Sequence, residues 1–306
     1  MAGHTNSGHE RGWGVADRIG IIGLGIMGSA YARNLSAAGW EIIGYDVDEG
    51  RYEALGNARV TRAASPGEVA GQVDRIITSL PTPAALAAVA GELAGAGHKV
   101  VVADTCTLRI SDKEAARDVL AKTGVIMLDT PVSGTGHQAA AGDLVVFGSG
   151  EQSAFERVRP AFEKMGRLVH YLGEFGNGSK MKFIANLLVA IHNVSAAEAI
   201  TFGIKAGIDP KTVYDVISTS AGTSRMFEIR GPMMVEGVYD RNVSATHRLM
   251  QKDLSVILDY AAQIACPTPL LHLAADIHLA AVAQGFEFED TGSVCAVTDR
   301  LAGVKR

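Results

Sequence analysis

The fold of this chain is decided by the stretch Ile19-Gly20-Ile21-Ile22-Gly23-Leu24-Gly25-Ile26-Met27-Gly28, in which an apolar strand pattern runs into a glycine-rich turn. Gly23, Gly25 and Gly28 have the spacing G-x-G-x-x-G. In that motif the first glycine permits a tight turn, the second lets a pyrophosphate approach the backbone, and the third lets a helix pack closely on the strand. The helix predicted for 29–38 points its N-terminal amides at the phosphates. The residues predicted to bind the dinucleotide here are Gly23, Leu24, Gly25, Ile26, Met27 and Gly28.

A carboxylate at the end of the second predicted strand bears on the choice of cofactor. The strand 41–45 is followed by Asp46, about twenty residues beyond the glycines, where a carboxylate accepts hydrogen bonds from an adenosine ribose. Asp46 would repel a 2′-phosphate, so the sequence favours NAD over NADP. Arg51 lies about a turn further on, where it could reach such a phosphate, but we interpret it as a solvated helix residue.

Composition limits the class of protein. A length of 306 residues accommodates two domains, and 47% hydrophobic and 20% charged residues are typical of a soluble globular enzyme. The formal net charge of −5 argues against a nucleic-acid partner, which needs a basic surface. Cys106, Cys266 and Cys295 are few and widely spaced, and no signal peptide is evident. These features predict a cytoplasmic protein without a disulfide framework.

The pattern of strands and helices divides the chain in two after a polar leader, residues 1–17, that we expect to be disordered. Residues 18–178 alternate strands with helices, which predicts an α/β, Rossmann-type domain with a mostly parallel sheet. Residues 179–306 carry no strand signal and are predicted to be all-α, entered by one long helix at 179–206. The strand 143–147 is expected to form a hairpin that extends the sheet antiparallel. The other predicted strands are 19–22, 41–45, 74–79, 99–103, 125–128 and 168–171, and the later helices are 210–219, 225–235, 248–264 and 269–284.

The longest apolar stretch, Phe183 to Ile204, lies inside the predicted long helix. A membrane span needs about twenty apolar residues with few polar ones. This stretch is interrupted by Asn186, His192, Asn193 and Glu198. It is therefore predicted to be a buried helix of a soluble protein, and no membrane partner is expected.

Two loops are predicted at the carboxyl edge of the sheet, where open α/β folds bind ligands. The strand 74–79 leads into Leu80-Pro81, where the proline stops the strand next to the cofactor. The turn Ser133-Gly134-Thr135 offers backbone amides and hydroxyls to a substrate carboxylate. An ordinary serine-glycine turn has the same composition, so the residues alone leave both interpretations open.

Lys182 and Asn186 are four residues apart and share one face of the long helix. Oxidation of an alcohol needs a group that accepts the hydroxyl proton, and a lysine can do this when burial lowers its pKa. Asn186 would then bond the substrate hydroxyl or hold the ammonium. From the residues alone, Lys180 competes with Lys182, and either lysine could simply be solvated.

The chain resembles the β-hydroxyacid dehydrogenases in several blocks that occur in the family's order. Besides the glycine turn they are Asp104-Thr105-Cys106-Thr107, Asp129-Thr130-Pro131-Val132-Ser133-Gly134, the stretch from Gly176 to Lys182 with Asn186, and Lys252-Asp253-Leu254. The resemblance implies that Lys182 is the general acid and base and that Asn186, Ser133, Gly134 and Thr135 hold the substrate. It also implies that Leu80, Pro81, Thr107 and Lys252 contact the cofactor, Lys252 from the helical domain.

Four positions depart from the family pattern. Cys106 stands where many relatives have serine, and we interpret it as a small replacement rather than a nucleophile. Thr135 replaces a glycine and Ala185 replaces the first of two asparagines. Arg225 stands where relatives often have tryptophan, so it either pairs with a polar substrate tail or is a helix-start arginine in solvent. The family gives no role to His137, which is expected to be structural or exposed.

The resemblance implies an NAD-dependent dehydrogenase that reversibly oxidises a short hydroxy acid, such as 3-hydroxyisobutyrate or threonate. A semialdehyde reductase is the alternative within the enzymes, and a nucleotide-binding protein without turnover is the alternative outside them. Lys182 counts against both an imine reductase and a non-catalytic relative. The apolar long helix predicts a homodimer or homotetramer, and no metal is expected.

Overall fold

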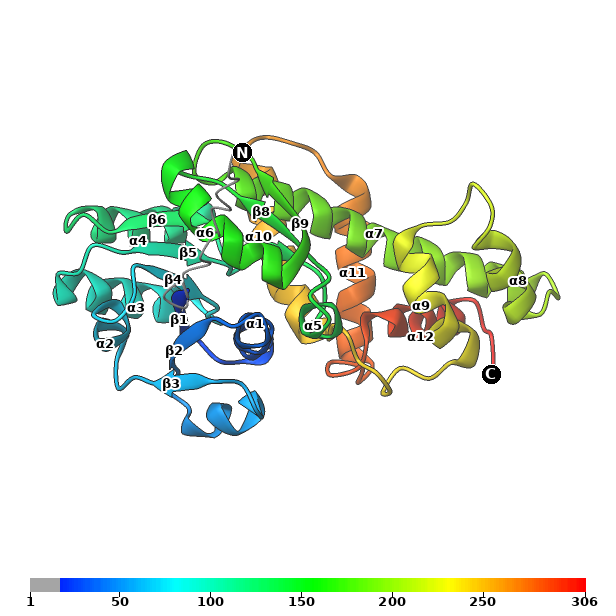
Figure 1. The fold of residues 1–306 in the computed structure, drawn as a ribbon. Helices are drawn as coiled ribbons and strands as arrows, with labels where there is room; N and C mark the ends of the chain where they lie inside the picture. Colours follow the sequence, from blue (N-terminus) through cyan, green and yellow to red (C-terminus); the bar gives the residue numbers. More distant parts are fainter. Residues whose placement is uncertain (1–16) are drawn as a thin grey trace, which may run out of the picture.

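A computed structural model describes residues 17–306, and the N-terminal part of these residues contains a six-stranded parallel sheet (Figure 1). The strand order is β3-β2-β1-β4-β5-β6. In this doubly wound order a dinucleotide binds at the carboxyl ends of the central strands. The strands are β1 (Arg18–Ile22), β2 (Glu41–Tyr45), β3 (Val60–Arg62), β4 (Arg75–Thr78), β5 (Val101–Asp104) and β6 (Ile126–Asp129). Of the leader predicted for residues 1–17, all but Asp17 lies outside the described residues.

Helices cover both faces of this sheet, because its strands are apolar on both sides. The helices are α1 (Ile26–Ala37), α2 (Pro66–Ala70), α3 (Pro83–Ala96), α4 (Ile110–Ala121) and α6 (Gln152–Met165), with a 3₁₀ segment, η1 (Glu49–Leu55), after β2. Ile19 and Ile21 belong to the core that contains α1 and α6. Ile22 belongs to a second core, which contains α2, α3 and α4. Both cores leave the carboxyl edge of the sheet to its loops.

The strand predicted at 143–147 does not extend this sheet, and that prediction was wrong. It forms β8 (Leu144–Gly148) in a separate three-stranded sheet with β7 (Val132–Ser133) and β9 (Gly166–Tyr171). β8 pairs antiparallel with β7, as the hairpin prediction required, but parallel with β9. Only one antiparallel bridge, Asp129 to Ser149, is recorded between the described strands of the two sheets. Pro131 lies two residues after the end of β6 and has no N–H, so the chain leaves the large sheet there.

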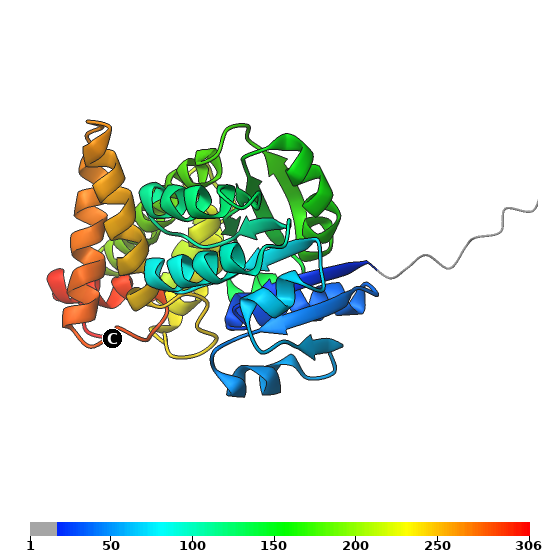
Figure 2. The same ribbon diagram turned by 90° about the vertical axis from the view of Figure 1, so that its left-hand side faces the viewer.

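From α7 onward the described chain is helical. Its elements are α7 (Asn177–Lys205), α8 (Pro210–Ile217), α9 (Arg225–Glu236), α10 (His247–Gln263), α11 (Pro269–Ala283), the 3₁₀ segment η2 (Thr291–Ser293) and α12 (Val294–Leu301). They surround a third core, to which α7 contributes Phe183, Ala190 and Ile200. α7 runs from the sheets into the helical part, and α10 and α11 pack side by side against it (Figures 1 and 2). The long helix therefore has its N-terminus beside the loops of the Rossmann part.

Two further differences from the prediction have local causes. α1 begins at Ile26, before the predicted residue 29, because Gly25 is already its N-cap and the glycine turn itself enters the helix. β3 is absent from the prediction because it is only three residues long, is largely exposed and contains Arg62. A short periodic pattern of this kind does not stand out from a loop.

Candidate active site

The glycine-rich turn joins β1 to α1, and its three glycines have different surroundings. Gly23 has a φ of +90°, and a Cβ on it would lie 2.2 Å from the carbonyl oxygen of Ser79. A Cβ on Gly28 would lie 1.8 Å from the carbonyl oxygen of Gly23, so only glycine lets α1 approach this closely. A Cβ on Gly25 would meet no atom of the described residues within 4 Å. The backbone at the N-terminus of α1 is therefore open to a pyrophosphate group, and the turn fits a bound dinucleotide.

The carboxylate of Asp46 is fixed against this turn. Its Oδ2 accepts a hydrogen bond of 2.6 Å from the Leu24 amide, and its Oδ1 accepts one of 2.9 Å from the Asp48 amide. A carboxylate has about four acceptor positions, so Asp46 keeps capacity for ribose hydroxyls. Arg51 pairs with Asp48 at 3.1 Å and both side chains are about half exposed, as expected for a solvated residue. Leu24 is buried, Met27 is half-buried and Ile26 is exposed.

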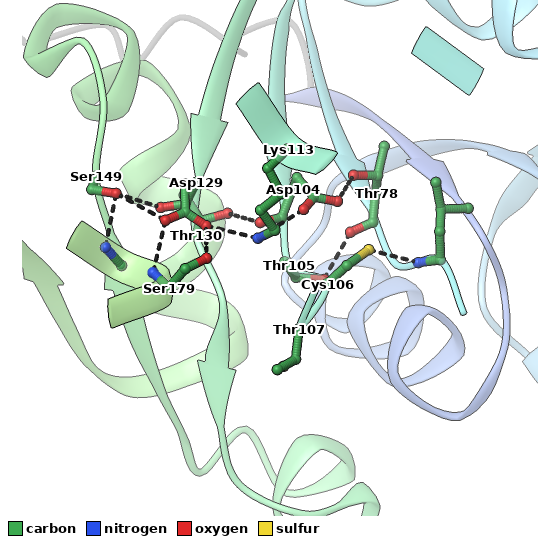
Figure 3. A network of polar contacts seen from close by, with 12 residues as sticks. Thr78, Asp104, Thr105, Cys106, Thr107, Lys113, Asp129, Thr130, Ser149 and Ser179 are labelled. Carbon is green, nitrogen blue, oxygen red and sulfur yellow. Dashed lines mark hydrogen bonds and ion pairs between the residues drawn. The ribbon is translucent and has the colours of Figure 1, made fainter. Parts of the chain in front are cut away.

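The loops after β4 and β5 are tied to each other and to α10. The amide of Leu80 donates to the Cys106 sulfur at 3.0 Å, and Pro81 follows on the exposed side (Figure 3). Burial raises the pKa of the Cys106 thiol well above its ordinary value, so the group is neutral and unsuited to act as a nucleophile. Lys252 of α10 donates from Nζ to the carbonyl oxygen of Thr107 at 3.0 Å. The helical part thus reaches the predicted cofactor loop.

The predicted substrate loop links β7 to the short helix α5 (Gly136–Ala140). Ser133 ends β7, and Gly134 and Thr135 are half-buried after it. Thr135 is the N-cap of α5: its hydroxyl accepts from the Gln138 amide while the Gln138 side chain accepts from the Thr135 amide. The hydroxyl that replaces a glycine in this loop therefore caps a helix. His137 is exposed, in agreement with the role predicted for it.

Lys182 lies in the second turn of α7 and is buried, with only 9% of its surface exposed. Burial lowers its pKa, and the nearby charge of Lys252 lowers it further, whereas the carboxylate of Asp253 raises it. The net direction is downward, which makes the neutral amine accessible nearer to physiological pH. Lys180, the competing residue, is exposed, and its Nζ donates to Asn177 Oδ1 at 3.1 Å. Burial therefore distinguishes the two lysines, which the sequence alone did not.

Asn186 is buried one turn after Lys182 and is held by α10. Its Nδ2 donates to Asp253 Oδ2 at 2.8 Å, and Asp253 Oδ1 pairs with Lys252 Nζ at 3.1 Å. The sequence reasoning assigned no role to Asp253. A carboxylate directly after Lys252 was the available signal, but only the packing of α10 against α7 brings it to Asn186.

Arg225 lies at the first position of α9, where its guanidinium pairs with Glu228 at 3.0 Å and 71% of its side chain is exposed. No contact recorded between residues 17 and 306 joins it to Lys182, Asn186 or the loop 133–135. Ala185, the other departure on α7, is half-buried.

The strands that lead into the predicted loops end at one edge of the sheet. Ile22, Thr78, Asp104 and Asp129, the last residues of four strands, are in register across neighbouring strands. α10 contacts the loop after β5 at two places. Lys252 donates to the Thr107 carbonyl oxygen, and Asp259 forms an ion pair of 2.5 Å with Arg109. Among residues 17–306, no group of three His, Cys, Asp or Glu side chains is placed to hold a metal ion.

α7 is the one described helix that is long and apolar enough to cross a membrane by length and composition. Its side chains argue for a different role, because Lys182, Asn186 and Asn193 are buried in it and α9, α11 and α12 pack against it. α7 is a core helix of the protein.

Fold and site together define a Rossmann-type dinucleotide-binding protein with a helical second part that covers the carboxyl edge of the sheet. Residues 18–173 match the family described as the NAD binding domain of 6-phosphogluconate dehydrogenase. Residues 176–298 match the family described as NAD-binding of NADP-dependent 3-hydroxyisobutyrate dehydrogenase.

Individual relatives agree. The chain is 34% identical to an L-threonate dehydrogenase of Cupriavidus necator, over 91% of this chain and 95% of the relative. It is also 34% identical to the human mitochondrial 3-hydroxyisobutyrate dehydrogenase, over 90% of this chain and 85% of the relative. A structure of Mycobacterium tuberculosis 3-hydroxyisobutyrate dehydrogenase with L-serine has a TM-score of 0.84 and 26% identity, and covers 93% of this chain and 99% of its own. The chain belongs to the β-hydroxyacid dehydrogenase family and is a nicotinamide-dependent oxidoreductase that acts on hydroxyl groups.

Proposed function

We propose that the chain oxidises a short hydroxy acid with NAD, reversibly, and that Lys182 is the general base in oxidation and the general acid in reduction. The observation that carries the proposal is the burial of Lys182 beside the sheet edge, which lowers its pKa. The names of the relatives, which include L-threonate and 3-hydroxyisobutyrate dehydrogenases, support a substrate of this class.

The residues of the chain divide the work as follows. The neutral amine of Lys182 accepts the proton of the substrate hydroxyl. Asn186, held by Asp253 at 2.8 Å, orients the hydroxyl beside it. The amides and hydroxyl of Ser133 and Gly134 bind the substrate carboxylate. A nicotinamide cofactor held by the glycine turn and Asp46 would supply the acceptor for the hydride from the carbon that carries the hydroxyl.

The proposed preference for NAD rests on Asp46. Its carboxylate is fixed by the Leu24 and Asp48 amides, so it cannot easily turn away from a 2′-phosphate. We expect tighter binding of NADH than of NADPH. Asp46→Asn removes the charge but keeps an acceptor oxygen, and should narrow the difference between the two affinities; an unchanged difference would contradict this role.

A matched pair of lysine variants tests the catalytic role. Lys182→Ala should lower kcat by about 10²–10⁴-fold, the usual contribution of general acid–base catalysis, with little change in NADH affinity. Lys180→Ala, two residues away on the exposed face, is the control and should retain activity. Turnover is followed by NADH absorbance with L-threonate, 3-hydroxyisobutyrate and L-serine as substrates. The corresponding oxo acid or semialdehydes with NADH test the reductase direction. Wild-type activity in Lys182→Ala would refute the mechanism.

We also propose that the chain forms a homodimer or homotetramer through α7 and α11. Met181, Ile184 and Leu188 lie on one side of α7 and are exposed, as are Leu270 and Leu273 on α11. Light scattering after size exclusion tests this, and a monomer would contradict it.

The proposed cytoplasmic localisation rests on the three cysteines, all described and none in a disulfide bond.

A further inference from the structure

A lysine to which no role has been given lies at the centre of the sheet edge. Lys113 of α4 is fully buried, and its ammonium lies between two buried carboxylates (Figure 3). Its Nζ is 2.9 Å from Asp104 Oδ2 and 2.7 Å from Asp129 Oδ1. Asp104 ends β5 and Asp129 ends β6, so the ammonium joins the ends of two neighbouring strands.

The Asp104 side of this cluster holds the cofactor loops. Thr78, the last residue of β4, donates from Oγ1 to Asp104 Oδ1 at 2.7 Å. Thr105 donates from Oγ1 to the Thr78 carbonyl oxygen at 2.7 Å. Leu80 follows Thr78 by two residues, and Thr107 follows Asp104 by three. Both proposed cofactor segments therefore start from this side.

The Asp129 side of the cluster is bonded to α7, the helix that carries Lys182, and precedes the proposed substrate loop. Asp129 Oδ2 accepts from the Ser179 amide at 2.7 Å, and Oδ1 accepts from the Ser179 hydroxyl at 2.8 Å. Ser149 donates to the Asp129 carbonyl oxygen at 3.1 Å and accepts from the Gly178 amide at 2.9 Å. Asp129 is thus bonded to the first turn of α7, one turn before Lys182, and Ser133 follows it by four residues.

Buried ion clusters are seldom the most stable solution, since apolar side chains of similar volume often stabilise as well or better. The two carboxylates here orient neighbouring segments, because each accepts hydrogen bonds from donors that lie elsewhere in the chain: Asp104 from Thr78 and Asp129 from Ser179. The Lys113 ammonium contacts both carboxylates and so ties the end of β5 to the end of β6.

We propose that Lys113 is a positioning residue for the reaction: by pairing with both Asp104 and Asp129 it sets α7, the helix that carries Lys182, in register with the proposed cofactor and substrate loops. The inference rests on the proposed function, because it acts through Lys182 and Ser133. Two other titratable groups face the cluster, Tyr31 of α1 and Cys106.

The charge states of these groups predict how the stability of the cluster depends on pH when Lys113 is replaced. Burial raises the pKa of Tyr31 and of Cys106, so both are neutral near physiological pH. Burial lowers the pKa of Lys113, but the two carboxylates together outweigh burial, so the net shift is upward and the group stays charged. In Lys113→Met the two carboxylates face each other without a cation, so like charges repel across the cluster. Loss of protons as pH rises can only increase this repulsion, so the variant should weaken toward alkaline pH.

The test compares wild type, Lys113→Met, Lys113→Met/Asp104→Asn and the control Lys122→Met, an exposed lysine at the end of α4. For each, kcat, KM, NADH affinity and the thermal midpoint are measured from about pH 6 to about pH 9. Lys113→Met should lower kcat by about 10²-fold at the alkaline end, as for a small misplacement of reacting groups, and less at the acid end. The double variant carries a single carboxylate and should lose the pH dependence and recover part of kcat. Lys122→Met should behave as wild type.

Wild-type kcat and KM in Lys113→Met across the range would overturn the inference, as would a pH dependence that persists in the double variant. A lower thermal midpoint with unchanged kcat would show a structural role only and would also overturn it. If Lys113→Met does not fold, the double variant must fold with activity, and its failure would overturn the inference. Lys182→Ala is measured in the same series: activity in that variant refutes the proposed function, whereas the thermal midpoints of the Lys113 variants still test the cluster without turnover.

Discussion

Substitution of glycine by alanine is predicted to have different effects at two positions of the glycine turn. In Gly28→Ala the new Cβ would lie 1.8 Å from the Gly23 carbonyl oxygen, far inside van der Waals contact, so α1 must shift away from the turn. Such overpacking costs typically about 1–3 kcal/mol. For a domain of this size each kcal/mol lowers the thermal midpoint by about 2–4 °C, so a loss of about 2–12 °C is expected.

Gly25→Ala should instead spare stability and impair binding. Gly25 has a φ of −65°, which any residue adopts, and its Cβ would meet no atom of the described residues within 4 Å. Alanine is a poorer N-cap than glycine, but it lowers the entropy of the unfolded chain by about 0.4–1 kcal/mol, and the two effects partly offset. The new methyl would stand where the pyrophosphate approaches, so NADH affinity should fall at least about tenfold, or ~1.4 kcal/mol.

Scanning fluorimetry of the free protein gives the thermal midpoints, and NADH fluorescence titration gives the affinities. We expect Gly28→Ala to lose mainly stability and Gly25→Ala to lose mainly affinity. Wild-type NADH affinity in Gly25→Ala would refute the assignment of this turn to the cofactor. A wild-type thermal midpoint in Gly28→Ala would refute the close packing of α1 on the turn.

Three further predictions concern the environment of Lys182, Arg225 and Cys106. Asp253 raises the pKa of Lys182 and Lys252 lowers it. The rise of kcat/KM for oxidation with pH should therefore move to lower pH in Asp253→Asn and to higher pH in Lys252→Gln. Shifts of the same sign in both variants would contradict this. If Arg225 binds a polar substrate tail, Arg225→Ala raises KM for the hydroxy acid without changing the thermal midpoint, because its ion pair is exposed; an unchanged KM ends that assignment. Cys106→Ser should keep kcat, since a hydroxyl can accept the Leu80 amide as the thiol does, and a large loss would reopen a chemical role for the thiol.

The fold was predictable from the sequence where the signal is local. β1 and β2, the helical second part and the start of α8 at Asp209-Pro210 all follow from short patterns of apolar residues, glycines and caps. The placement of β8 was not predictable in this way. β8 could have joined either the six-stranded or the three-stranded sheet, and an apolar strand pattern does not indicate which strands it pairs with. The division of the chain at residue 178 stays a prediction.

The residues of the proposed site also fall into those that the sequence indicated and those that only the packing reveals. Residues that follow a strand or open a helix, such as Asp46, Leu80 and Lys182, could be proposed from the sequence because the topology places them at one edge. Asp253 and Lys113 could not. Each acts through partners distant in the sequence, and each resembles an ordinary helix residue in the printed chain.

The two lysines at this edge show why burial has to be known before a charge can be given a role. Burial lowers the pKa of Lys113, but its two flanking carboxylates outweigh that effect, so it stays charged and can hold other groups in place. Lys182 is also buried, but only Asp253 opposes the effects of burial and of Lys252, and its pKa falls. The same side chain is therefore a fixed cation at one position and, in the proposed mechanism, a proton acceptor at the other. Which role a lysine takes is decided by how many carboxylates the fold brings within reach, and that number follows from the packing of α4, α7 and α10 rather than from the sequence around each lysine.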